Sequence, residues 1–466
     1  MRSETLFDHN PGPRARAYRA VGIFLALHLG VPAVASLAIS LAAPVAASAQ
    51  TWTLDRVLET ARRSDPGIAA ARAAGDAGSA AAASGWSALS PRIGLDAGWT
   101  RSDDPALLFS QKLWQGRFTA ADFALPTLND PAPRSAWNWG ATAEQPLWNG
   151  GAEVTAPALA AHRGRAARES ARAAVADRLL EVAGVYVEAV RARDALEADS
   201  IALAAAEESR RSAVERFRRG QIPELDTLRA TAHWAETRVA ALGSDRRVQV
   251  ALARLATTVG QRVLREDLGM LPDPAGQNRD ASRSEPDVAA RPEYVAAREE
   301  ARARGIEVTR ASLALLPSLN ARADVRRYED PESGGGARRF FVGLTASFPI
   351  WDGTRRIQER RIARARADEA VARAELLKRA LAASTLDAAV DAEVSLDRRD
   401  AAHLGAASAE EALRLAQGRY RAGLLPQSDL LAVEAEAARA RHARVDAESD
   451  AVLAQYRLLH ARGMLE

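Results

Sequence analysis

Residue types that commonly carry catalysis occur in this sequence, but not at catalytic spacings. No two histidines beyond residue 50 form the H-x-x-x-H pair of a zinc-protease helix. These histidines are His162, His233, His403, His442 and His460. The chain has no G-x-x-x-x-G-K-S/T phosphate loop, so any energy must come from a partner. Acidic pairs such as Glu207-Glu208 are typical of solvated helix faces, and we expect no enzyme activity, no metal site and no cofactor.

Two carboxylates recur at the same place in two similar segments. The segment RFRRGQIPELDTL spans residues 216–228, and RYRAGLLPQSDLL spans residues 419–431. In each segment a helical pattern ends at a glycine, meets a proline and resumes near an aspartate, Asp226 or Asp429. The glycines suit left-handed C-caps, and the prolines block continuation of the first helix. We expect each aspartate to cap the next helix by accepting a backbone hydrogen bond.

Apolar residues stand at the tips of both turns. Ile222, Leu424 and Leu425 are expected to be exposed there, and an exposed apolar tip on an exported protein indicates a docking surface. The alternative is a tight helical hairpin whose leucines pack locally.

An internal duplication places these turns in a larger plan. A shift of 203 residues lays residues 146–260 over 349–463 without a gap, and Pro146-Leu147-Trp148-Asn149-Gly150 falls on Pro349-Ile350-Trp351-Asp352-Gly353. We expect a first repeat at 50–260, a linker or equatorial segment at 261–289 and a second repeat at 290–466.

Each repeat is predicted to contain the same order of elements, namely helix, strand, strand, very long helix, hairpin tip and helix. The first repeat is expected to have a helix at 54–89, strands at about 91–101 and 136–146, a long helix at 152–219 and a helix at 226–258. The second is expected to have a helix at about 290–315, strands at about 317–327 and 339–349, a long helix at 355–421 and a helix at 429–461.

The strand segments alternate apolar and polar residues and have the length of membrane-crossing strands. Tryptophans near their ends resemble interfacial aromatics: Trp99, Trp137, Trp139, Trp148 and Trp351. A half-buried sheet in a soluble domain is the alternative. Since an open sheet edge is not tolerated in lipid and barrels need at least about eight strands, four strands require a second or third copy of the chain.

The long helices predict a tall wall rather than a globular core. Residues 152–219 would extend for roughly 100 Å at the helical rise per residue. Every seventh residue forms a seam that packs helices side by side, and the seam ends at Arg210 and Phe217. A solvated coiled-coil rod is the alternative, and the strand segments argue against it.

The N-terminal residues are typical of an export signal. Arg14, Arg16 and Arg19 precede an uncharged apolar run that ends before Ala47-Ser48-Ala49, so residues 1–49 are predicted to be a cleaved signal peptide. A membrane anchor is the alternative. The formal net charge of +3 gives no reason to expect nucleic-acid binding, and the absence of cysteine excludes disulfides and thiolate metal sites.

These features together resemble the outer-membrane efflux protein (TolC) family over residues 52–463. The resemblance implies a mostly α fold with a small membrane β part. It implies a homotrimer whose twelve strands, four per chain, form one barrel in outer-membrane lipid, continued by a long α-helical tunnel through the periplasm of a Gram-negative bacterium. The tunnel would be closed at rest. An inner-membrane RND, ABC or MFS pump and a periplasmic adaptor (membrane fusion protein) would open it.

The resemblance also assigns residues. Asp429 matches a position whose three copies form a carboxylate ring at the closed entrance, Tyr420 matches a tyrosine that helps hold the closed state, and Asp226 matches the aspartate of the sister hairpin; Phe217 joins this expected gate. The adaptor would dock on the hairpin tips, Gly220, Gln221, Ile222, Pro223, Gly423, Leu424, Leu425 and Pro426. The chain departs from the family pattern at Ala432 and Leu425, where a second aspartate and an arginine stand in other members, so closure would depend less on salt bridges.

The predicted function is therefore the passive outer-membrane channel of a tripartite efflux or type I secretion system. A periplasmic adaptor and a fibrous periplasmic protein without a pore are the alternatives. The loop at 102–134 is expected to be extracellular or folded back over the mouth. The cargo stays open among drugs, metal ions and polypeptides.

Overall fold

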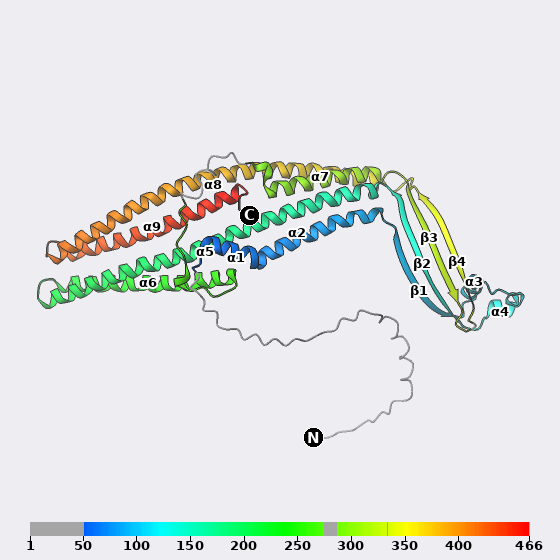
Figure 1. Cartoon of the computed structure of the whole chain (residues 1–466), viewed down its shortest axis with the longest axis horizontal. Coiled ribbons are helices and arrows are strands. Elements are labelled where there is room, and N and C mark those ends of the chain that lie inside the picture. The colour runs from blue at the N-terminus through cyan, green and yellow to red at the C-terminus, as the bar shows by residue number, and fades with distance from the viewer. Residues whose placement is uncertain (1–50, 275–286, 333, 466) are drawn as a thin grey trace, which may run out of the picture. The chain divides into compact units, whose positions relative to one another are not determined.

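The computed structural model describes residues 51–274, 287–332 and 334–465. The predicted signal peptide and part of the predicted linker lie outside these residues. Two antiparallel systems make up the described chain: a set of long helices and a four-stranded sheet that continues from one end of them (Figure 1).

The duplication is visible in the element bounds. The long helices α5 (Ala152–Arg218) and α8 (Arg355–Arg421) each have 67 residues and begin and end at equivalent positions. Each turns back into a shorter helix, α6 (Glu224–Val259) or α9 (Gln427–Ala461). In the other direction α5 and α8 are flanked by α2 (Pro66–Ser84) and by α7 (Pro292–Leu313). Alanine-rich helices approach closely here, since small side chains fill the contact faces.

The helix expected at 54–89 is not continuous, and that prediction is wrong. The structure has α1 (Leu54–Ser64), α2 (Pro66–Ser84) and the 3-10 turn η1 (Gly85–Leu89). The break falls at Asp65, which has extended backbone angles because a proline follows it. The Asp65 carboxylate caps α2 by accepting hydrogen bonds from the backbone N–H groups of Gly67 at 2.8 Å and Ile68 at 3.1 Å.

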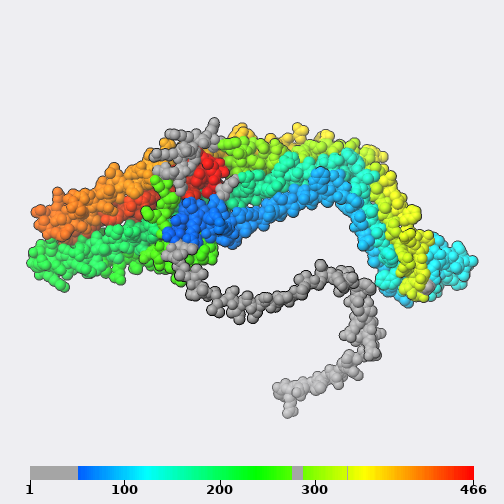
Figure 2. Space-filling model, in the orientation of Figure 1, coloured from blue at the N-terminus to red at the C-terminus, as the bar shows by residue number. Residues whose placement is uncertain are grey.

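The main apolar core lies where α1 and α2 meet the middle of α5, α6 and the C-terminal end of α9. Tyr186 of α5 is fully buried in it and donates a 2.8 Å hydrogen bond to the backbone oxygen of Trp52. Burial raises the pKa of Tyr186 to about 12, so this phenol stays a donor at any physiological pH. Figure 2 shows the C-terminal end of α9 reaching the surface beside α1.

The described chain also has two short 3-10 turns. The turn η3 (Arg265–Asp267) directly precedes Leu268 of this core, and η5 (Val288–Ala290) contacts α7 and α8. A backbone bridge between Trp52 and Leu268 ties the first described residues to the segment that follows α6. None of the described helices is both long enough and apolar enough to span a bilayer.

The sheet is a meander with strand order β1-β2-β3-β4, all pairs antiparallel. Its strands are β1 (Arg92–Ser102), β2 (Arg134–Asn149), β3 (Ser318–Glu329) and β4 (Gly336–Ser347). β4 begins and ends earlier than the expected range 339–349. Pro349 lacks a backbone donor for a ladder, and the chain leaves the sheet before it.

The segment expected as a loop at 102–134 contains helices. α3 (Pro105–Gln115), the 3-10 turn η2 (Ala120–Phe123) and α4 (Leu125–Asn129) follow β1 at the end of the sheet remote from the long helices (Figure 1). Arg117 of this segment forms a 2.5 Å ion pair with Asp330, and Trp114 packs on Tyr328 with ring centroids 5.2 Å apart. The segment is therefore fixed to the β3–β4 turn.

Candidate functional site

The two hairpin tips have the same backbone construction. Gly220 and Gly423 adopt φ values of 69° and 76°, which only glycine accepts without strain. After α5, Gly220 donates to the carbonyl of Phe217 and Gln221 donates to that of Arg216; after α8, Gly423 and Leu424 repeat this pattern. This is the Schellman arrangement, and it confirms the left-handed C-caps predicted from the sequence.

The expected capping role of the two tip aspartates is wrong. α6 and α9 begin directly after Pro223 and Pro426, and neither start has a side-chain cap. Asp226 and Asp429 therefore lie inside the first turn, where a negative charge interacts favourably with the positive end of the helix dipole. Asp226 is half-buried and lies 3.8 Å from Arg229, whereas Asp429 is exposed.

The expected exposure of the apolar tips holds for one residue of three. Leu424 is 76% exposed. Ile222 and Leu425 are half-buried instead, and Leu425 packs against a small cluster formed by Leu413, Tyr420 and Leu430. Both alternatives, local packing and an exposed docking surface, therefore apply at this tip: Leu425 packs locally, and Leu424 is exposed to solvent.

A contact between the two hairpins was not predicted from the sequence. Arg216, near the end of α5, donates through Nη2 to the backbone oxygens of Tyr420 at 2.6 Å and Arg421 at 3.0 Å. Its guanidinium also lies 4.3 Å from the centre of the Tyr420 ring. The Tyr420 oxygen also accepts from the backbone N–H of Gly423, so Arg216 adds a second donor there, and its positive charge lies at the negative end of the α8 dipole.

Tyr420 and its counterpart Phe217 lie in different surroundings. Tyr420 is buried between α8, α9 and Arg216, and burial raises its pKa, although the Arg216 charge opposes that rise. Phe217 is largely exposed. The structure therefore brings Tyr420 to the contact between hairpins and leaves Phe217 outside it.

Buried polar groups join the helical wall farther from the tips. Asp199 of α5 accepts hydrogen bonds from Ser244 of α6 and, at 2.7 Å, from His442 of α9. Glu434 of α9 accepts a hydrogen bond from Ser209 of α5 and lies 3.5 Å from His233 of α6. These contacts fix the relative rotation of three helices, which an alanine-rich apolar seam does not specify alone.

The strand register separates the sheet into a polar and an apolar face. On the polar face Arg326 lies 3.0 Å from Asp96, Thr142 donates to Asp324 at 2.9 Å, and Arg322 lies 3.5 Å from Glu144. Because directly paired residues point the same way, the charged residues of β1, β2 and β3 form one mixed-charge surface.

The opposite face of the sheet is apolar and uncovered. Trp99 pairs with Trp137, and Trp139 pairs with Ala97 across β1 and β2. Phe340, Val342 and Leu344 of β4 lie on the same face. The exposed members include Ile93, Leu95, Trp99, Trp137, Trp139, Phe340, Val342 and Leu344. Trp148 is half-buried beyond a register shift in β2, and Trp351 is exposed between β4 and α8.

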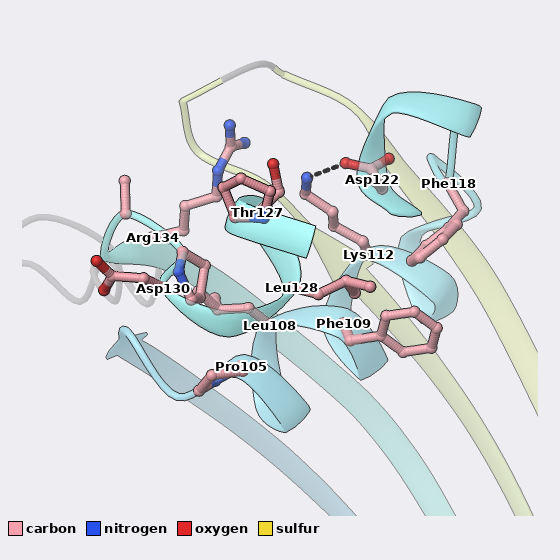
Figure 3. Close-up of a pocket in the computed structure, with 13 residues that line it drawn as sticks. Pro105, Leu108, Phe109, Lys112, Phe118, Asp122, Thr127, Leu128, Asp130 and Arg134 are labelled. Carbon is pink, nitrogen blue, oxygen red and sulfur yellow. Dashed lines mark hydrogen bonds and ion pairs between the residues drawn. The ribbon is translucent and has the colours of Figure 1, made fainter. Parts of the chain in front are cut away.

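The hollow drawn in Figure 3 lies between α3 and α4 and has a volume of about 330 Å³. Lys112 and Asp122 form an ion pair in it, and the Lys112 hydrogen bond lowers the pKa of Asp122 to about 2. Phe109, Phe118 and Phe123 pack edge to face around it, with centroids 4.5–6.4 Å apart. We interpret the side chains around the hollow as the small core of this segment.

Among the described residues, no group of three or more histidine or acidic side chains is arranged to hold a metal ion.

Comparisons with known proteins agree with this architecture. The profile of the outer membrane efflux protein family matches residues 57–261 and 281–464. The outer membrane protein OprJ of Pseudomonas aeruginosa is 31% identical over 137 residues, a match that covers 29% of each protein.

Solved structures are similar over most of the chain. The outer membrane channel CmeC of Campylobacter jejuni aligns with a TM-score of 0.73 and 17% identity over 89% of this chain and 86% of its own. A membrane protein of Pseudomonas aeruginosa aligns with a TM-score of 0.73 and 22% identity over 88% and 93%. At these identities the likeness establishes the fold.

Proposed function

The chain belongs to the outer membrane efflux protein family, and from this membership we propose that it is the outer-membrane channel of a tripartite efflux or type I secretion system. The observation that carries the proposal is the four-stranded sheet with one apolar and one charged face, continued by helices of 67 residues. Such a sheet has a lipid side and a water side. The helices are long enough to reach roughly 100 Å beyond it.

The open edges of the sheet support a trimer. β1 and β4 each have a partner strand on one side only. A strand edge cannot remain unpaired in lipid, so β4 of one chain would pair with β1 of the next. Three chains would then close a twelve-stranded barrel, with the Arg326–Asp96 face lining its water-filled lumen.

The tunnel entrance would lie at the hairpin tips, with Asp429 as its ring of carboxylates. Asp429 is exposed in the first turn of α9, free to point into a shared axis. Tyr420 and Asp226 would stabilise the closed entrance, and Phe217 would lie at the contact between subunits. A narrow ring of three carboxylates attracts cations and repels anions.

Single-channel recording tests this proposal. The purified protein should insert into planar bilayers as a cation-selective channel, and Asp429→Asn should reduce the selectivity. Asp96→Asn, which removes a carboxylate from the wide barrel end, is the matched control and should change it little. Selectivity that is the same in Asp429→Asn as in the unmodified channel would exclude the ring.

Energy and selection of cargo would come from partners. The described chain contains no nucleotide-binding or metal-binding arrangement, so we assign it the role of a passive conduit. An inner-membrane RND, ABC or MFS pump would supply the energy, and a periplasmic adaptor would dock on the tips around Gly220 and Gly423. The charged N-terminal run and the A-x-A site support export through a cleaved signal peptide.

A further inference from the structure

Arg216 forms a defined contact that closes the gap between the two hairpins of one chain. Its guanidinium donates to the final carbonyls of α8 and covers the Tyr420 ring. This geometry suits arginine, because one guanidinium nitrogen, Nη2, donates to both oxygens while the planar group stacks on the ring. We call this three-residue contact, Arg216 with Tyr420 and Arg421, the inner clasp.

Because of the duplication, the chain contains a second set of residues equivalent to those of the inner clasp. Arg419 is equivalent to Arg216, Phe217 is equivalent to Tyr420, and Arg218 is equivalent to Arg421. The two helix ends also share one backbone conformation, so the carbonyls of Phe217 and Arg218 have the geometry of those that Arg216 binds. Within the described part of the chain, Arg419 is exposed and forms no ion pair or side-chain hydrogen bond.

Burial differs between the two sets. Phe217 is 41% exposed, whereas Tyr420 under its arginine is 3% exposed. Phe217 is therefore not covered as Tyr420 is, and among the described residues Arg419, the equivalent of Arg216, forms no ion pair or side-chain hydrogen bond.

The same difference extends along the helices. Leu242 of α6 is 64% exposed while its equivalent Val445 of α9 is 3% exposed, and Val390 of α8 is 53% exposed while its equivalent Val187 of α5 is 2% exposed. Within the chain α9 packs along α5. The repeat of that packing is α6 of one chain along α8 of another.

We propose that Arg419 forms an outer clasp between subunits, donating to the backbone oxygens of Phe217 and Arg218 of the partner subunit with its guanidinium over the partner's Phe217 ring. The inference rests on the trimer proposed above. A head-to-tail contact of this kind closes into a ring, in which inner and outer clasps alternate around the tunnel entrance. Each clasp joins a cation to carbonyls at the negative end of a helix and to an aromatic face.

The absence of cysteine makes a cross-linking test specific. In the full-length protein, the pair Phe217→Cys with Arg419→Cys is treated with a short bismaleimide, and products are separated under denaturing conditions. The matched pair is Arg216→Cys with Tyr420→Cys, which lies within one chain at the equivalent place. The first pair should give covalent dimers and trimers, and the second should give a linked monomer only.

The controls distinguish a failure of the outer clasp from a failure of the proposed trimeric channel. Single-cysteine variants should give no ladder, and native mass spectrometry of each variant reports whether the trimer is present. If the variants are trimeric and the Arg216/Tyr420 pair is cross-linked, but the Phe217/Arg419 pair gives only monomer, the outer clasp is wrong. The proposed channel function would not be affected by that result. A monomeric protein would instead overturn the trimer itself.

A second measurement covers the case in which the cysteine pair does not assemble. Arg419→Gln should lower the dissociation temperature of the trimer, and Arg419→Lys should restore it only in part, since an ammonium group can donate to the carbonyls but has no planar group to stack on the Phe217 ring. Arg360→Gln, at the other end of α8, is the control and should have no such effect. Equal shifts in Arg419→Gln and Arg360→Gln would contradict the clasp.

Discussion

Asp65 shows how one residue organises a junction between helices. Its carboxylate caps α2 and accepts three hydrogen bonds from Arg178 of α5 at 2.8–3.2 Å, with no exposed side-chain area. The Arg178 hydrogen bond lowers the pKa of Asp65 below its ordinary value, against the opposing effect of burial. The Asp65-Pro66 step was visible in the sequence, but the arginine that makes the break stable lies more than a hundred residues away.

Asp65→Asn should therefore destabilise the protein by about 2 kcal/mol, because the amide keeps the cap but loses charge-assisted bonds to Arg178. Since the folded pKa is lowered, the carboxylate contributes fully above its unfolded pKa of about 4 and the contribution is lost as pH falls through the folded value. Thermal unfolding followed by circular dichroism from pH 7 to pH 3 measures this. Glu59→Gln removes only an exposed pair with Arg63 and should change little; equal effects of the two substitutions would contradict the assignment.

Thr354 is the one described residue other than glycine with a positive φ, at 68°. Its equivalent in the first repeat is Gly151, where an added Cβ would lie 2.3 Å from the Leu313 side chain. A β-branched residue in this conformation is strained, so Thr354→Gly should stabilise the protein by about 1 kcal/mol. The midpoint of thermal unfolding should rise. Thr354→Ala keeps most of the backbone strain and should give a smaller rise, and an unchanged midpoint in Thr354→Gly would contradict the strain.

At the scale of elements, the sheet has two faces that predict opposite responses to charge. Val342 lies on the apolar face, and Thr345 lies on the polar face of the same strand. Val342→Arg should cost about 2–4 kcal/mol if its face meets lipid, while Thr345→Arg should be tolerated in a wet lumen. Assembly into outer membranes, measured as folded protein per cell, distinguishes them. Equal tolerance of both substitutions would mean that neither face contacts lipid.

The hairpin tip predicts a separate loss of function. Leu424 is exposed in the turn between α8 and α9, which Figure 1 shows at the end of the helices remote from the sheet, and an adaptor would cover it. Leu424→Asp should abolish export in cells while leaving the trimer and its conductance unchanged. Leu125→Asp, which changes an exposed apolar residue near the opposite end, is the control and should export normally. Normal export by Leu424→Asp would remove this leucine from the docking surface.

The order of elements could be predicted because the same pattern occurs twice in the sequence, once in each repeat. The glycines and prolines of the two turns predicted the hairpins, and the alternation of apolar and polar residues predicted a sheet with two different faces. The sequence could not reveal that α6 and α9 begin at Glu224 and Gln427, since an aspartate suits a cap and a first turn equally well. The helix α3 was missed although the sequence contains its signals, an Asp104 cap, Pro105 at the first position and Gly116 at the C-cap. The five-residue helix α4 has no side-chain cap and no comparable set of signals.

The candidate site was predictable only in part for the same reason. Asp429 and Tyr420 came from a resemblance, and Leu424 came from its place in the repeat. Arg216 was missed because its acceptors are backbone carbonyls of the other repeat, which leave no residue-type signal in the sequence. A comparison of burial at equivalent positions, which needs the structure, was required to find Arg419.

At the scale of the whole molecule, every feature indicates that one chain is an incomplete wall. The sheet has two open edges, its apolar face is uncovered, and α6 and α8 leave apolar residues exposed whose equivalents are buried. A monomer would leave these surfaces in contact with water or leave strand edges unpaired in lipid, and both are costly. Closure by identical copies, as proposed above, would pair the strand edges and cover the exposed helix faces, and the apolar sheet face would meet lipid.

The most direct test of this account is the number of chains in the particle extracted from outer membranes, counted by native mass spectrometry in detergent. The account predicts three copies, which dissociate only when the detergent micelle is removed and the complex is activated. A single chain that remains folded and dispersed without detergent would contradict it.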